Sequence, residues 1–176
     1  MRRMSEKRMQ HMSEKLRVSF NSPQCGWMSF ELRAGEQSLI NAVSSVRYDS
    51  LRDLIRALSR LLYEDAGLTV KWAYEPDEVD FNFKARGERA ALEVKWYKNH
   101  LRLEGAGERV FFYEGARLGL CHPFWEALRD MQSDMEVDEF ARNWGREFPA
   151  SEMQQLAEDI TAYRREQARR TDPSAS

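Results

Sequence analysis

The amino-acid sequence predicts an α+β fold: an antiparallel β-sheet of about five to seven strands, one central amphipathic helix on one face, and two or three C-terminal helices. Three observations support this prediction. Residues 50–64 carry large aliphatic side chains at helical spacing. Four stretches between residues 68 and 114 alternate apolar and polar residues, as strands do. From residue 123 onward the apolar residues return to helical spacing.

The central helix is expected from Ser50 to Glu64. Ser50 and Asp53 form an acidic variant of a capping box at its start. Gly67, shortly after its end, is a natural stop signal. One face of this helix is wholly apolar and must be buried against a sheet. That face consists of Leu51, Leu54, Ile55, Leu58, Leu61 and Leu62.

The N-terminal third is expected to supply two or three antiparallel strands. Residues 16–21 and 27–33 alternate between apolar and polar side chains. Residues 37–46 begin in the same way and lose the pattern after Asn41. A turn-rich segment at 21–26 separates the first two strands.

Four strands joined by short polar turns are expected after the central helix. They cover residues 68–75, 79–84, 90–97 and 109–114, each with one apolar and one polar face. The apolar face of this meander matches the apolar face of the central helix. The sequence therefore predicts a two-layer sandwich of helix on sheet.

The last third is expected to be helical. A first helix runs from 123 to about 132, with Pro123 in its opening turn. A capping box at 133–136 starts a second, short helix that stops at Gly145. Ser151 caps a third helix that extends to about residue 170.

These patterns divide the chain into four parts. Residues 1–15 form a flexible basic N-terminal tail, and residues 16–132 form the α+β domain. Residues 133–170 are a C-terminal helical extension packed on that domain, and residues 171–176 are a frayed tail.

Composition fits a globular chain: of 176 residues, 32% are charged and 42% hydrophobic. No uncharged apolar run approaches the roughly 20 residues that a membrane span needs, so no membrane association is expected. The N-terminus lacks the apolar core of a signal peptide, which favours the cytoplasm. Cys25 and Cys121 could be two free thiols or one disulfide, and a cytoplasmic location favours reduced thiols.

Negative charge is concentrated in residues 114–160, which hold eleven acidic and four basic residues. One interpretation is the solvated faces of ordinary helices. The other is an acidic docking surface for a basic protein partner. Its candidate residues are Glu126, Asp130, Asp138 and Glu139.

Arg52, Arg56 and Arg60 recur at every fourth position on the polar side of the central helix. Such a row is either a solvated face with internal ion pairs or a stripe that grips phosphates or an acidic protein. Nucleic-acid binding is not expected, because the whole chain has a net charge of −2.

No motif in the sequence predicts a cofactor, a metal or a catalytic residue. Neither glycine-rich phosphate loop occurs, and no cysteine or histidine spacing suits zinc. His122, which lies beside Cys121 ahead of a predicted helix, is the one histidine in a suggestive place. An enzyme would have to assemble its site from His122 and dispersed carboxylates.

The order of elements resembles a known group of proteins. A strand pair is followed by residues 46–62 (VRYDSLRDLIRALSRLL), by 70–78 (VKWAYEPDE), and then by further strands. This layout is similar to that of small α+β proteins encoded beside secreted polymorphic or contact-dependent toxins of bacteria and regarded as immunity proteins. The resemblance implies a protein that binds a toxin tightly and blocks its active site, commonly with an acidic surface against a basic toxin domain. It assigns no binding residue.

The expected function is therefore a non-enzymatic protein-binding module, most specifically an immunity-type inhibitor of a cognate toxin. Two alternatives remain open. One is a small enzyme whose site includes His122, and the other is an adaptor or structural subunit that forms a homodimer through its C-terminal helices.

Overall fold

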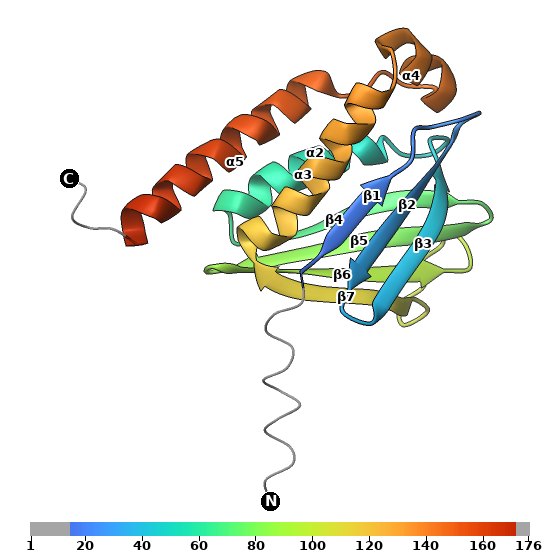
Figure 1. Cartoon of the computed structure of the whole chain (residues 1–176). Coiled ribbons are helices and arrows are strands. Elements are labelled where there is room, and N and C mark those ends of the chain that lie inside the picture. Colours follow the sequence, from blue (N-terminus) through green and yellow to red (C-terminus); the bar gives the residue numbers. More distant parts are fainter. Residues whose placement is uncertain (1–14, 172–176) are drawn as a thin grey trace, which may run out of the picture.

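The computed structural model describes residues 15–171, which form one seven-stranded sheet and four α-helices (Figure 1). The strands are β1 (Arg17–Phe20), β2 (Trp27–Ala34), β3 (Gln37–Ser44), β4 (Gly67–Tyr74), β5 (Asp77–Arg86), β6 (Arg89–Tyr97) and β7 (Glu108–Ala116). The helices are α2 (Ser50–Tyr63), α3 (Arg117–Asp134), α4 (Val137–Trp144) and α5 (Ala150–Thr171). The predictions for residues 1–14 and 172–176 lie outside the described residues.

The strands lie in the sheet in the order of the sequence, and every neighbouring pair is antiparallel. This confirms the predicted α+β fold with an antiparallel sheet. β3 and β4 are paired only at Ser44 and Ala73, so the sheet turns a corner there. Beyond that corner β1–β3 run across one face of β4–β7 (Figure 1). Phe30 of β2 consequently meets Phe81 of β5, with ring centroids 5.1 Å apart.

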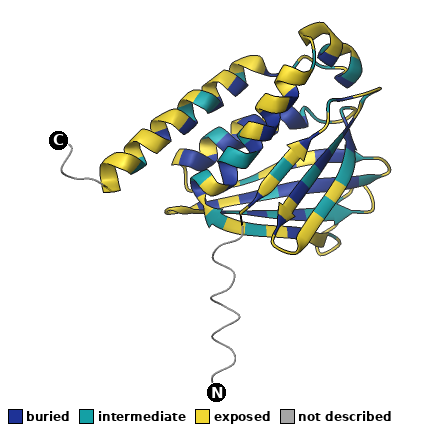
Figure 2. Cartoon of the chain, viewed as in Figure 1, coloured by how far each residue is buried: buried dark blue, intermediate teal, exposed yellow. Residues whose placement is uncertain are grey.

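The core lies inside this folded sheet and under α2, as the burial colours of Figure 2 show. All six aliphatic residues of the predicted apolar face of α2 are buried. The predicted two-layer sandwich was incomplete, because β1–β3 share the inner face of β4–β7 with the helices. A corner between two strands depends on contacts distant in sequence, which residue alternation does not report.

The predicted ends of the central helix were partly wrong. Ser50 does begin α2, but it is fully buried and its hydroxyl donates to the carbonyl of Lys71 in β4, so it does not cap the helix. Asp49 occupies the N-cap position without a side-chain capping bond. The helix ends at Tyr63, and Gly67 belongs to β4. Contact with the sheet decides both ends.

Arg117 fixes where β7 ends and α3 begins. Its side chain is buried and donates to the carbonyl oxygens of Leu61 and Glu64 at 2.7 Å and of Gly87 at 2.6 Å. Leu61 and Glu64 lie at the C-terminal end of α2, where carbonyl groups lack helical partners and favour a cation. Arg117 also pairs with Asp65. One side chain therefore joins α3, α2 and the β5–β6 turn.

The first predicted C-terminal helix begins earlier than expected. α3 starts at Arg117, and Pro123 lies inside it instead of in its first turn. Burial explains the extra turns, since Leu120 and Cys121 are fully enclosed. Gly119 and Pro123, both poor helix formers, obscure this helix in the sequence.

The caps of the last two helices were also misplaced. Ser133 belongs to the last turn of α3 and donates to the carbonyl of Asp130, while α4 begins at Val137 with no side-chain cap. Ser151 lies within α5, which begins one residue earlier, and it bonds to the carboxylate of Glu152. Gly145 ends α4 with φ 81°, as predicted.

Both cysteines are free thiols, Cys25 exposed and Cys121 buried. Among residues 15–171 no helix has the length and apolar character needed to cross a membrane. α5 packs against α2 and contributes Leu156, Ile160 and Tyr163 to the core.

Candidate functional site

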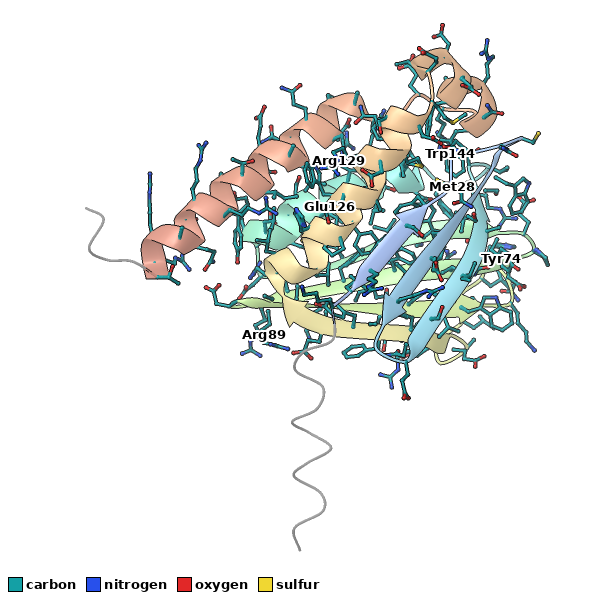
Figure 3. All side chains as sticks on the ribbon, in the orientation of Figure 1. Met28, Tyr74, Arg89, Glu126, Arg129 and Trp144 are labelled. Carbon is teal, nitrogen blue, oxygen red and sulfur yellow. The ribbon has the colours of Figure 1, made fainter. Side chains whose placement is uncertain are left out.

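A groove of about 940 Å³ opens where β1, the end of β7 and one face of α3 meet. Figure 3 labels Arg89 near the end of β7, and Glu126 and Arg129 along α3. The volume is within the range of ligand-binding clefts, roughly 300–1,000 Å³. Residues 15–20, Arg89 and residues 113–116 line it from the sheet, and Gly119, His122, Pro123, Glu126, Ala127, Arg129 and Asp130 line it from α3.

The end of β7 lines this groove with its backbone edge. Side chains of a strand alternate between two faces, yet four consecutive residues, 113–116, border the groove. The amide of Arg117 donates to the carbonyl of Glu88, which marks a bonded antiparallel pair. Because such pairs alternate along the ladder, the backbone groups of Glu114 and Ala116 point away from β6, toward the free edge.

Phe112, two residues earlier, confirms that alternate residues of β7 point their backbone groups away from β6. Its backbone groups also point to the free edge, and the side-chain amide of Gln37 in β3 binds both of them. The Phe112 N–H donates to Oε1 over 3.1 Å, and Nε2 donates to the Phe112 carbonyl over 3.0 Å. The edge of β7 is thus occupied at Phe112. Ala116 is the N-cap residue of α3, so its carbonyl accepts the first hydrogen bond of that helix. Among the described residues, no hydrogen bond reaches the N–H or carbonyl of Glu114, or the N–H of Ala116, from the free side.

Charged groups in the groove pair with one another. His122 Nδ1 lies 3.3 Å from the Glu126 carboxylate, Arg89 lies 2.8 Å from Glu114, and Arg129 lies 3.0 Å from Asp130. Most of these side chains are about half exposed, so each pair contributes at most about 1 kcal/mol to stability.

The β1 wall adds positive charge. Lys15 and Arg17 line the groove, and no ion pair within residues 15–171 involves either of them. The groove therefore holds four basic side chains against three carboxylates, counting His122 as neutral.

His122 is the groove residue best suited to proton transfer. Partial burial lowers the pKa of its imidazole, while the carboxylate of Glu126 opposes that shift. Its ring lies against Trp125, with centroids 5.4 Å apart. Cys121 points the other way: its thiol lies 3.6 Å from the carbonyl of Leu58, and burial raises its pKa to about 12. The adjacent cysteine and histidine thus form no catalytic pair.

Tyr113 and two glycines shape the inner wall. The Tyr113 ring covers Gly115 so closely that a Cβ there would collide with its hydroxyl. A Cβ on Gly119 would lie 3.4 Å from the same hydroxyl. Burial raises the pKa of Tyr113, against the opposing charge of Arg89, so the phenol stays protonated at neutral pH. Pro123 has no N–H for the carbonyl of Gly119, which leaves a further acceptor in this wall.

The structure separates the acidic residues proposed from the sequence. Glu126 and Asp130 lie in the groove, whereas Asp138 and Glu139 lie in the first turn of α4, outside it. These four residues therefore do not line one cleft. Sequence reasoning missed the basic residues of the groove, because Arg17 and Arg89 meet it from strands far apart in the chain.

The arginine row on α2 pairs with other elements. Arg52 and Arg56 lie 3.3 and 2.8 Å from Glu152 of α5, and Arg60 lies 2.8 Å from Glu64. Of these pairs, only Arg60–Glu64 is the kind that the solvated-face interpretation expects, whereas Arg52 and Arg56 reach across to α5.

A second charged cluster, unforeseen from the sequence, lies on the other face of β5. Glu78 and Asp80 are buried there, and Arg102 from the β6–β7 loop lies 2.8 Å from each of them. Arg102 also donates to the Tyr48 hydroxyl, and Arg47 lies 3.0 Å from Glu78. Burial works against the charge of Arg102, but its bonds to Asp80 and Tyr48 outweigh burial and raise its pKa. We call these five residues the outer-face cluster.

Within residues 15–171 no group of three histidine, cysteine or acidic side chains is placed to hold a metal ion. The fold and the groove define an α+β protein with a folded antiparallel sheet and an open groove at its unpaired edge. Comparisons with protein-family models, with curated proteins and with solved structures find no match.

Proposed function

We propose that this chain is a protein-binding module that takes a polypeptide segment of its partner into the groove between β1, β7 and α3. The observation that carries the proposal is the free edge of β7. There the N–H and carbonyl of Glu114 and the N–H of Ala116 border the groove and have no partner on that side among the described residues. Unpaired strand edges are the parts of sheets that recognise extended peptides.

The polar side chains of the groove suit binding better than chemistry. Three ion pairs hold most of its charged groups, and the phenol of Tyr113 is protonated at neutral pH. Mutual pairing fixes these side chains in place, so less conformational entropy is lost when a partner binds.

Neutralisation of a toxin is the specific form of this role that the layout resemblance suggests. In that case the bound segment would belong to the toxin, and co-expression with this chain would rescue bacterial growth from it. A variant with a blocked groove would not rescue growth. Rescue by the blocked variant would place the toxin-binding surface elsewhere.

Random peptides displayed and selected on the folded chain test the groove directly. Glu126→Trp places an indole in the groove from a half-exposed position, and Glu158→Trp makes the same change on the exposed face of α5. We expect selected peptides to lose affinity by at least about tenfold for Glu126→Trp and to keep it for Glu158→Trp. Selection of no peptide, or equal binding by both variants, would overturn the proposal.

The second candidate is an enzyme, and the pair of His122 and Glu126 is the observation in its favour. A carboxylate that holds one imidazole nitrogen leaves the other free to accept a proton. A panel of chromogenic esters and phosphomonoesters tests this candidate. Hydrolysis that disappears in His122→Asn would favour the enzyme, and we expect none.

A further inference from the structure

The free edge of β7 has two parts with the same backbone geometry and different occupancy. At Phe112 the outward N–H and C=O are bound by the side chain of Gln37. At Glu114 the N–H and carbonyl face the groove, and at Ala116 the N–H does. Residues whose backbone groups point outward are spaced by two, so Phe112, Glu114 and Ala116 form one row along the edge of β7.

Gln37 shows which chemistry this edge accepts. Its side-chain amide presents one C=O and one N–H in the arrangement of a peptide group, and it binds Phe112 as a neighbouring strand would. β3 approaches β7 but does not pair with it along its length; its backbone is paired with β2 and, at Ser44, with β4. The amide of Gln37 thus takes the place of a strand at one position only.

We infer that an extended segment of the partner protein adds to β7 as an edge strand at Glu114 and Ala116, beginning where the contact of Gln37 ends. This inference rests on the proposed function and specifies its binding mode. The N–H groups of Glu114 and Ala116 donate to carbonyls of the segment, and the carbonyl of Glu114 accepts from a segment amide. The carbonyl of Ala116 is taken by the first turn of α3.

The two faces of the groove determine which types of side chain such a segment carries. On the inner side it meets Tyr113, Pro123 and Ala127, which suits a small apolar residue. On the outer side it passes Lys15 and Arg17, whose charges no described residue pairs. Alternation along a strand then gives a segment with apolar residues facing inward and an acidic residue facing Lys15 and Arg17.

Proline at position 114 tests the strand pairing. The Glu114 N–H points away from β6, so Glu114→Pro removes the edge donor and leaves the ladder with β6 intact. Glu114→Gln is the matched control, because it removes the carboxylate and the ion pair with Arg89 but keeps the N–H. Both variants are compared by circular dichroism and by titration with the peptides selected on the wild-type chain.

We expect Glu114→Pro to weaken peptide binding by at least about tenfold, while Glu114→Gln stays within a few-fold of wild type. Equal binding by both variants would overturn the inference. The proposed function would survive that result if Glu126→Trp still blocked the peptides, and would fail if it did not.

Amide hydrogen exchange of the wild-type chain decides the question if Glu114→Pro does not fold. In the peptide complex the amides of Glu114 and Ala116 should exchange at least about tenfold more slowly. The amide of Phe112, already bonded to Gln37, serves as the control and should change little. Unchanged exchange at Glu114 and Ala116 would overturn the inference.

Discussion

The groove and the outer-face cluster both collect charged side chains, but they use them differently. In the cluster, Glu78 is 1% exposed, Asp80 5% and Arg102 12%, and Arg102 bonds to both carboxylates. In the groove the paired side chains are mostly about half exposed and open to a partner. Buried ionic groups destabilise a fold unless all of them are bonded. The bonded cluster therefore holds the β6–β7 loop and the β3–α2 connection against the sheet. The groove keeps its polar groups accessible, as the proposed binding of a partner segment requires.

The largest expected effect comes from Arg102. Arg102→Met leaves Glu78 and Asp80 buried without their main cation, which should cost about 3–5 kcal/mol of unfolding free energy. Arg129→Met in the groove is the control and should cost less than about 1 kcal/mol, because its pair with Asp130 is exposed. Urea unfolding of both variants measures the difference. Equal losses would mean that the two regions do not differ in their contribution to stability.

The second prediction contrasts the two faces of α3. Cys121, next to the groove residue His122, points into the core, and its pKa is raised to about 12. The unfolded chain loses this thiol proton near pH 8.5 and the folded chain does not, so stability should fall by up to about 1.4 kcal/mol per pH unit above pH 9. Cys121→Ser should remove this part of the slope. Cys25→Ser, at an exposed thiol, should leave it unchanged. Identical slopes in all three proteins would show that Cys121 is not enclosed.

Local sequence patterns predicted the parts of the fold that depend on nearby residues. Strand alternation and the leucine spacing of α2 were sufficient for the sheet and the central helix, because one buried face dictates each pattern. The caps at Ser50, Ser133 and Ser151 were wrong, since each hydroxyl found another partner in the folded chain. A capping motif in the sequence shows that a side chain is able to cap a helix. It does not show whether another hydrogen-bond partner lies closer in the folded chain.

Neither charged region could be predicted from the sequence. Arg102 meets Glu78 and Asp80 only because the β6–β7 loop folds back over β5. The groove depends on the corner between β3 and β4, which brings Arg17 toward the end of β7. Of the groove, the sequence indicated Glu126 and Asp130 as acidic docking candidates and His122 as a histidine ahead of a helix. Their common helix face became visible only in the structure, because α3 begins before the predicted start at 123.

The third prediction concerns pH and the groove. Because partial burial lowers the pKa of His122 below its usual 6.5, the unfolded chain takes up a proton before the folded chain as the pH falls. Stability should therefore decline from about pH 6.5 downward, until the folded imidazole is also protonated. Arg164 and Arg129 add to this lowering of the pKa, and Glu126 opposes it. The decline should be smaller than the alkaline effect of Cys121, because His122 is only partly buried and Glu126 offsets part of the shift. His122→Asn should flatten this part of the pH profile of thermal unfolding. An unaltered profile would mean that His122 is hydrated as in the unfolded chain.

The smallest effect on stability, and the sharpest on binding, is expected from reversing the acidic groove residues. Glu126→Lys combined with Asp130→Lys should change the unfolding free energy by less than about 1 kcal/mol, because both carboxylates are exposed. The reversal adds positive charge beside Lys15 and Arg17, so peptides with the inferred acidic residue should associate faster, most clearly at low ionic strength. Reversal of Asp138 and Glu139 on α4 is the control and should leave the rate nearly unchanged. Slower association of the groove variant would instead assign the docking role to its carboxylates, as an acidic inhibitor of a basic partner requires. Stopped-flow measurements at two salt concentrations separate these results, because only a charge effect shrinks as salt screens it.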